Sequence, residues 1–436
     1  MNQTERFLLF LWILLAAAPY AYTQTDSLNY RANSLNSPTD SLNYRTIGLE
    51  YYLANALQNS PLLKDYRNQI QSAQVDSQII RAGYGVLVNG NSFNNYAPVI
   101  NGFGYDNAIS NGGTFSTLVT VNKTLVGRNH LSAQFETLQL LSRGLNNTAK
   151  ISEQDLKKSI TAQYIIAYGD MQQLNFNRET YTLLQKEEQL LKNLTEKNVY
   201  RQTDYLAFLV TLQQQGLLVR QLEIQFRNDY GTLNYLSGIT DTSAVSLREP
   251  SVNLQQLPEI ANSAFFMQYQ IDSLKLRNSR SLLDFSYKPK LILNADAGFS
   301  STLVNTVYKN FGTSFGFTVT MPIYDGHQRR LQYKKMDIAD RTRNGYKSFF
   351  TSQYRQQIAQ LTQQLRATEE LISQINGQIK YSETLITVNG KLLATGDAKI
   401  AEYILALSNY LNAKNLLTQN SITRLQIINQ INYWNR

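Results

Sequence analysis

Two stretches of the chain combine helical apolar spacing with a complete lack of proline. Between residues 128 and 198 one apolar stripe advances in steps of three and four: Ile160, Tyr164, Ala167, Met171 and Leu174. The same spacing recurs between 328 and 394, in Phe350, Tyr354, Ile358, Leu361 and Leu365. About 70 residues of helix span ~105 Å, which suits a coiled coil or a helical tube better than a compact domain. The glutamine-rich faces that remain fit a wet interior lining and an ordinary solvated surface equally well.

Shorter segments alternate apolar and polar residues with the period of a strand. Between 288 and 323 one side of the alternation carries Phe315, Phe317, Val319 and Met321, and the other side carries Ser314, Gly316, Thr318 and Thr320. A similar pair of strands is expected between 85 and 126, although 85–96 alternates poorly, and residues 111–113 and 310–312 have the chemistry of hairpin turns. Such strands are typical of a transmembrane barrel, but a soluble β-sandwich gives the same pattern. Four strands cannot close a barrel, since small barrels use about eight, so membrane insertion would require an oligomer.

The two halves of the sequence resemble each other at nearly constant spacing. Residues 56–66 resemble 259–269, Phe115 with its neighbours recurs at Phe315, and 204–206 resemble 402–404. This order predicts a duplicated unit of helix, two strands, long helix, turn and helix. We place the two copies at 46–240 and 254–430, with a linker or equatorial segment at 241–253 and a C-terminal end at 431–436.

The N-terminus has the pattern of a secretory signal peptide over residues 1–23. Its apolar run from Phe7 to Pro19 is too short for a membrane-spanning anchor, which is the alternative reading. Residues 24–45 are polar and contain a tandem repeat, so we expect them to form a tail before the first unit.

Composition removes several classes of function. The 436 residues include no cysteine and two histidines, His130 and His327, which we expect to pack at strand–helix junctions rather than to bind a metal. The net charge of +9 comes from dispersed basic residues, which does not favour nucleic-acid binding. Because no catalytic grouping or phosphate-binding loop occurs, we expect no enzyme activity and no cofactor.

Several motifs resemble those of the TolC family of outer-membrane efflux and secretion channels. The run from Pro322 through Asp325 and Gly326 to Arg329 looks like that family's strand-to-helix junction. Residues 393–396, followed by 400–404 and 410–414, look like its periplasmic turn. The resemblance covers about residues 46–430 and includes the duplication.

The resemblance implies a mainly α fold with a four-strand transmembrane contribution. In a homotrimer these strands would form a 12-stranded β-barrel in the outer membrane, in contact with its lipid, and the long antiparallel helices would form an α-barrel across the periplasm. A periplasmic adaptor protein and an inner-membrane pump, of the RND, ABC or another class, would complete a tripartite efflux pump or a type I secretion system. Transport through the channel itself would be passive.

The resemblance also indicates candidate site residues near the two helix turns. Candidates for the periplasmic aperture are Glu402, Asp204, Lys399, Leu405 and Arg201. Candidates for adaptor contact are Asn198, Val199, Tyr200, Thr395, Gly396 and Asp397. Glu402 matches one of two inward acids that the family can place at this turn, but Leu405 occupies the other position. Glu402 and Asp204 also fit a simpler interpretation, as acids that stabilise a helix N-terminus.

Two departures from the family pattern are present in the first unit. Asn198 stands where the family usually has glycine, and asparagine tolerates the left-handed conformation that such a turn requires. The first strand-to-helix junction lacks a proline.

Two other classes of function are weighed against the channel. A periplasmic or surface coiled-coil adhesin would not need two strand hairpins at matching positions, and a soluble extracellular enzyme lacks candidate chemistry.

Overall fold

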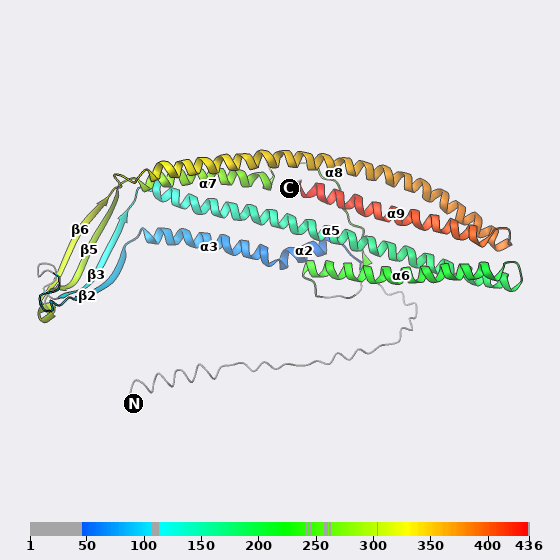
Figure 1. Ribbon diagram of the computed structural model, residues 1–436, viewed down its shortest axis with the longest axis horizontal. Helices are drawn as coiled ribbons and strands as arrows, with labels where there is room; N and C mark the ends of the chain where they lie inside the picture. The colour runs from blue at the N-terminus through cyan, green and yellow to red at the C-terminus, as the bar shows by residue number, and fades with distance from the viewer. Residues whose placement is uncertain are drawn as a thin grey trace, which may run out of the picture. The chain divides into compact units, whose positions relative to one another are not determined.

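Two helical hairpins make up most of the described chain (Figure 1). The structure is a computed structural model that describes residues 46–105, 113–240, 243, 246–256, 260, 263–302 and 304–434. In each hairpin a long helix turns back into a shorter one: α5 (Arg128–Glu196) into α6 (Gln202–Ser237), and α8 (Gln328–Thr395) into α9 (Ile400–Tyr433). The two predicted long helices are confirmed, at 69 and 68 residues. The expected signal peptide over 1–23 and tail over 24–45 lie outside the described residues.

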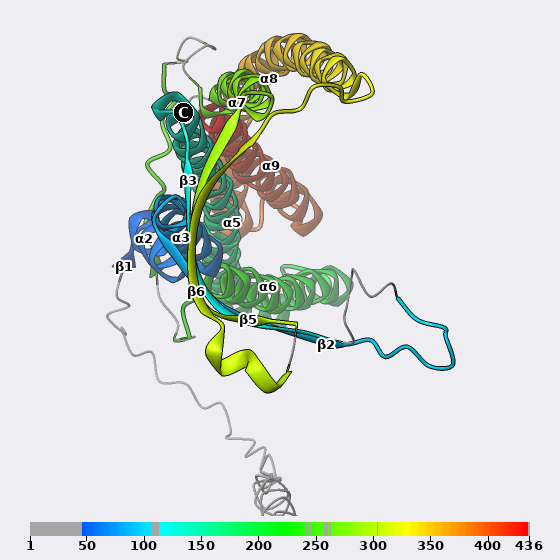
Figure 2. The same cartoon turned by 90° about the vertical axis from the view of Figure 1, so that its left-hand side faces the viewer.

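The four helices lie side by side in the order α8, α9, α5, α6 (Figure 2). The two hairpins meet where α5 packs against α9, and Gly169 lies at this contact. A Cβ atom placed on Gly169 would come within 2.6 Å of Ile422 Cγ1, so glycine permits the close approach of the two helices. The layer therefore has two outer edges, α8 on one side and α6 on the other.

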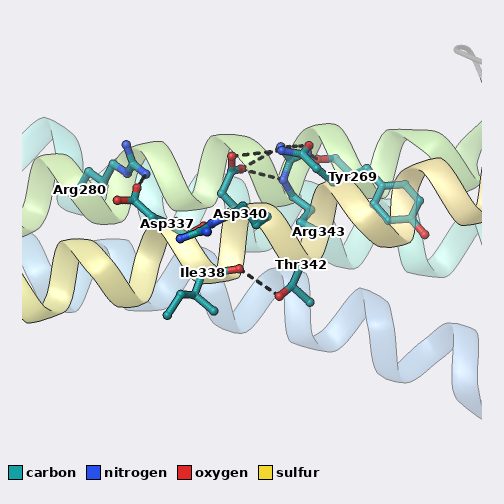
Figure 3. Close-up of polar contacts among 9 residues, drawn as sticks. Tyr269, Arg280, Asp337, Ile338, Asp340, Thr342 and Arg343 are labelled. Atoms are coloured by element: carbon teal, nitrogen blue, oxygen red, sulfur yellow. Dashed lines mark hydrogen bonds and ion pairs between the residues drawn. The ribbon is translucent and has the colours of Figure 1, made fainter.

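Three shorter helices, α2 (Leu49–Asn59), α3 (Pro61–Gly83) and α7 (Ala264–Ser286), pack against this layer. Helix α2 packs against α5 and α6, α3 against α5, and α7 against α5 and α8. Serine side chains begin two of them, since Ser60 Oγ accepts from the Leu63 amide and Ser263 Oγ accepts from the Phe266 amide, each at 3.4 Å. Figure 3 shows how α7 is fixed to α8: Arg343 donates to Asp340 on its own helix and to the Tyr269 carbonyl oxygen, 3.1 Å away on α7.

Four strands form one antiparallel sheet in the order β2, β3, β5, β6. Their bounds are β2 (Leu87–Tyr96), β3 (Gly113–Leu125), β5 (Lys290–Ser301) and β6 (Phe311–Thr320). Directly paired residues of antiparallel strands point to the same face. Ala295 pairs with both Val121 and Phe315, and Leu293 pairs with Phe317, so the apolar positions of three strands share one face. Phe315 is 92% exposed there, and the outer edges of β2 and β6 have no strand partner within the described chain.

The connection between β5 and β6 differs from the expected hairpin turn at 310–312. The chain reverses earlier, through a 3₁₀-helix over Val304–Lys309, and Phe311 and Gly312 already pair within the sheet. The Asn310 side chain closes the connection by donating to the Thr306 carbonyl oxygen at 2.9 Å and to Ser301 Oγ at 3.0 Å. The other expected turn, at 111–113, falls largely outside the described residues. Among the described residues, no helix is both long and apolar enough to cross a membrane.

Residues 246–247, within the stretch expected to be a linker or equatorial segment, take part in the core. Strand β4 (Ser246–Leu247) pairs in parallel with β1 (Thr46–Ile47), and Leu247 is buried. The buried Tyr164 of α5 donates its hydroxyl to the Arg248 carbonyl oxygen at 2.6 Å and approaches the Ile47 carbonyl oxygen at 3.1 Å. One tyrosine on a long helix therefore holds both short strands.

Candidate functional site at the helix hairpin tips

The first hairpin turns through residues 197–201. Helix α5 ends at Glu196 and is capped by Lys197, and Asn198 adopts φ 61°, in the left-handed region. The Val199 amide returns to the Leu194 carbonyl oxygen at 2.9 Å and so closes the helix end. Asparagine thus takes the backbone conformation that was expected of it at this position.

The second hairpin turns through residues 396–399 around a glycine. Gly396 has φ 84°, and the Asp397 amide returns to the Leu392 carbonyl oxygen at 2.9 Å. Thr395 Oγ1 donates to Asp397 Oδ2 at 2.6 Å, so Asp397 orders its own turn. A Cβ atom on Gly396 would lie 2.9 Å from Val199 Cγ1, which shows that the two turns pack against each other.

Tyr200 joins the two hairpins at their tips. Its hydroxyl lies 2.9 Å from the Leu393 carbonyl oxygen and 3.0 Å from the Ala398 carbonyl oxygen, and its single proton serves both. Burial, together with the nearby Asp397 carboxylate, raises the pKa of Tyr200, so the hydroxyl stays a donor. The sequence had indicated Tyr200 as an adaptor-contact residue and had not predicted this role between hairpins.

An apolar core lies directly beneath the turns and holds the hairpins at one level. It is built from both hairpins, with Leu184, Leu191, Phe208, Leu393, Ile400, Tyr403 and Leu407 all buried. At its border the Tyr205 hydroxyl donates to the Glu188 carboxylate, and this hydrogen bond together with burial raises the pKa of Tyr205 to about 12.

The five aperture candidates are all exposed in the single chain. Asp204 and Glu402 lie in the first turns of α6 and α9, and Arg201 and Lys399 are the residues immediately before these helices. Leu405, one turn further along α9, is 63% exposed. Within the described part of the chain none of the four charged side chains forms an ion pair, so the contact between hairpins is made by Tyr200 and the apolar core instead.

The strand-to-helix junction at Pro322, Asp325 and Gly326 lies at the opposite end of α8. Asp325 accepts from the Tyr287 hydroxyl at 2.6 Å and from the Arg329 amide at 2.8 Å, and these two donors hold the pKa of Asp325 below its usual range. Gly326 and His327 both have positive φ values, which turn the chain from the sheet into α8. Arg329 then forms an ion pair with Asp284 of α7 at 2.6 Å.

The two histidines lie at junctions between strands and helices. The His130 ring stacks on Phe285 with a centroid distance of 5.5 Å, and His327 contacts Tyr324 edge-on at 5.8 Å. Among the described residues, no group of three His, Cys, Asp or Glu side chains is placed to hold a metal ion.

Comparison with known proteins gives a match in fold. No protein-family model and no curated protein sequence matches the chain. Solved structures do match: the outer-membrane channel OprN at a TM-score of 0.71 and 13% identity, covering 88% of this chain and 89% of that one. CusC matches at a TM-score of 0.72 and 12% identity, over 93% of this chain and 98% of that one, in a study of its transmembrane channel formation. The outer-membrane protein VceC of Vibrio cholerae matches at a TM-score of 0.71 and 13% identity, over 89% and 96%.

The chain therefore has the fold of these outer-membrane channels. The resemblance to the TolC family expected from the sequence is confirmed at the level of the fold.

Proposed function

We propose that the protein is an outer-membrane channel that forms the exit duct of a tripartite efflux pump or a type I secretion system. The observation that carries this proposal is the four-stranded sheet, which extends from helices with a channel fold. The sheet has one apolar exposed face and two edges that are unpaired within the described residues. Unpaired strand edges invite pairing with another chain, and an apolar outer face suits lipid. A coiled-coil adhesin would not need this sheet.

In this proposal three copies of the chain form the channel. Twelve strands would close a barrel in the outer membrane, with β6 of each copy paired to β2 of the next. The helices, about 100 Å long, would cross the periplasm as an α-barrel. Transport through the channel itself is passive. The inner-membrane pump supplies the energy, and the periplasmic adaptor connects the pump to the channel.

The proposed duplication is supported by where the elements begin. Helices α3 and α7 begin at 61 and 264, α5 and α8 at 128 and 328, and α6 and α9 at 202 and 400. The offsets of 203, 200 and 198 residues agree with those seen between similar sequence segments. We infer that residues 46–240 and 254–430 arose as two copies of one unit.

The turns at 197–201 and 396–399 are proposed to dock the adaptor, with Asn198, Val199, Tyr200, Thr395, Gly396 and Asp397 at or beside the contact. The turns lie at the end of the long helices that is remote from the sheet, so they would project away from the outer membrane (Figure 1). Cysteine at Val199 or Thr395 should crosslink to the adaptor. Labelling of these cysteines from outside intact cells would contradict the orientation.

Glu402 is proposed to line a narrow aperture that favours cations in the resting trimer. Three copies ~7 Å apart would repel by roughly 0.6 kcal/mol per pair in water, and more when partly desolvated. Lys399 and Arg201 supply the cations that offset this repulsion, Asp204 adds a second acid, and Leu405 adds an apolar constriction. In the simpler alternative, Glu402 is a helix-end acid facing away from the pore.

The experiment that tests the proposed function uses the full chain, expressed with its own N-terminus. Outer-membrane extraction, mass measurement in detergent and conductance in planar bilayers should give a trimer that conducts ions. A protein recovered in the soluble periplasmic fraction, or a monomer that still conducts, would refute the architecture.

A further inference from the structure

Three segments that carry the chain between the sheet and the helices concentrate positive charge. Residues 123–130, 284–290 and 321–335 hold eight basic and two acidic side chains, a net charge of +6 in a chain whose total is +9. The first segment contributes Lys123 and Arg128, the second Lys288 and Lys290, and the third two adjacent pairs at 329–330 and 334–335. Because the three segments lie far apart in the sequence, the charge looks dispersed there. We call the three segments together the junction collar.

Pairing and side-chain contacts bring the segments of the junction collar together, where β3, β5 and β6 meet α5, α7 and α8 (Figure 1). The first segment joins the second where β3 pairs with β5. The second joins the third through the hydrogen bond of Tyr287 to Asp325 and the ion pair of Arg329 with Asp284. Both acids of the collar therefore already have partners.

The remaining seven basic side chains of the collar are all exposed, and none forms an ion pair within the described part of the chain. Helices α5 and α8 add to the positive potential, since both begin in the collar and neither has an acid in its first turn. At the hairpin tips, by contrast, α6 and α9 begin with Asp204 and Glu402 in their first turns. Cations beside a helix N-terminus are unfavourable on their own, so an anionic partner would stabilise the collar.

Apolar side chains beside these cations indicate that the anion belongs to a lipid. The apolar positions of β6 continue beyond the strand in Met321 and Ile323, which are 53% and 93% exposed. Lys123 itself lies on the apolar face of the sheet, where it pairs with Leu293. On this face of the four described strands Lys123 is the one charged side chain.

The position of Lys123 along the sheet suits a lipid headgroup. Its level is that of Leu293, two residues from the last apolar pair of β5 and β6, which is Leu291 with Val319. Two residues of strand span ~7 Å, or about 5 Å of depth at the tilt of a membrane barrel. A lysine side chain can cross this depth and place its ammonium group at the boundary of the hydrocarbon, while its stem stays in apolar surroundings.

We propose that the junction collar binds the phosphate groups of anionic phospholipids in the leaflet of the outer membrane that faces the periplasm. Clusters of lysine and arginine beside a membrane-spanning segment attract anionic lipids. The collar lies on the side of the sheet from which the helices extend, so it would meet the periplasmic leaflet. This inference rests on the proposed outer-membrane channel and specifies the lipid that the channel takes.

Binding of lipid to the full-length trimer in a neutral detergent tests the collar. Native mass spectrometry counts the bound molecules of phosphatidylglycerol, which is anionic, and of phosphatidylethanolamine, which has no net charge. The parent should bind phosphatidylglycerol at least tenfold more tightly, and about 0.5 M salt should weaken this preference because exposed charges are screened.

Charge-neutralising variants assign the preference to the collar. The double variant Lys123→Gln, Lys334→Gln should bind phosphatidylglycerol at least fivefold more weakly than the parent and phosphatidylethanolamine equally well. The matched control Lys192→Gln, Lys391→Gln removes two exposed charges near the hairpin tips and should keep the parent's preference. Lys334→Gln alone, on the surface of α8, should lose at least twofold, which keeps the test valid if the double variant does not assemble.

The outcomes separate the collar from the channel. A conducting trimer without a preference for phosphatidylglycerol, or with the same loss in the control as in the double variant, overturns the collar and leaves the channel standing. A double variant that alters ion selectivity in planar bilayers but keeps its lipid binding shows that these cations face the lumen, and the proposal is then wrong. A chain that forms no conducting trimer overturns the proposed function and the collar with it.

Discussion

A carboxyl pair between α5 and α6, with Asp170 buried and Asp229 half-buried, should make the stability of the first hairpin depend on pH. Asp170 is 5% exposed; its Oδ1 accepts from Gln225 Nε2 at 2.9 Å, and its buried Oδ2 has no hydrogen-bond partner among the described residues. Burial and the neighbouring Asp229 carboxylate raise the pKa of Asp170 from 3.8 to about 7. Asp229 is itself held by Gln163 Nε2 at 3.1 Å, so it cannot easily move away. A proton shared between the two carboxyl groups gives the buried Asp170 Oδ2 a hydrogen-bond partner.

The sign of the effect follows from the direction of the shift. The pKa of Asp170 is higher in the folded chain than in the unfolded chain. Its contribution to the free energy of unfolding is therefore fully favourable below about pH 4 and is lost as the pH rises through about 7. One pKa unit corresponds to about 1.4 kcal/mol. Part of this stabilisation is already lost at pH 5. The free energy of unfolding should therefore fall by at most roughly 3 kcal/mol between pH 5 and pH 9.

The variant Asp170→Asn should remove this dependence, because an amide donates to Asp229 at every pH, as the protonated acid does. Guanidinium unfolding followed by circular dichroism at pH 5 and pH 9 measures the difference in the free energy of unfolding. The control Asp65→Asn changes an exposed carboxylate on α3 and should keep the slope of the parent. If Asp170→Asn loses as much stability as the parent between the two pH values, the carboxyl pair is not the cause.

Three further predictions concern the tips and the sheet. Tyr200→Phe removes a hydrogen bond worth about 1 kcal/mol and should raise resting conductance in single-channel recordings, whereas an unchanged closed state would show that the apolar core alone holds the tips. Glu402→Gln should weaken cation selectivity and Leu405→Ser should raise resting conductance; unchanged selectivity would assign Glu402 to the helix end. Gly298→Ala should impair folding of the sheet, because its Cβ would lie 2.2 Å from the Thr117 carbonyl oxygen, and heat-modifiable migration of the extracted protein would then be lost.

The long helices and the strands could be predicted because their signals are periodic and extend over many residues. A stripe such as Ile160 to Leu174 repeats over several turns, and the alternation at Phe315 and Phe317 repeats over a whole strand. The connection after β5 could not be predicted in detail. Asn310 and Gly312 are typical turn residues, but a short 3₁₀-helix reverses the chain before them.

Contacts between the two halves were also hidden in the sequence. Tyr200 bonds to backbone carbonyl groups nearly 200 positions away, and a carbonyl group carries no sequence signal. The parallel pairing of Thr46–Ile47 with Ser246–Leu247 could not be predicted either, because two residues are too few to show the alternation of a strand. The aperture candidates could be proposed from their position beside the turns, but their orientation depends on neighbouring copies.

The unlike edges of the helical layer have a consequence for assembly. Two copies joined head to tail form one contact and leave one α6 edge and one α8 edge uncovered, and the same holds for the sheet edges at β2 and β6. In the proposed ring the third copy covers all of these open edges at once. It forms two contacts with its neighbours and loses the translational and rotational freedom of only one molecule. Dimers should therefore be scarce at every concentration, and the yield of complete rings should rise steeply, close to the third power of the concentration of free chains.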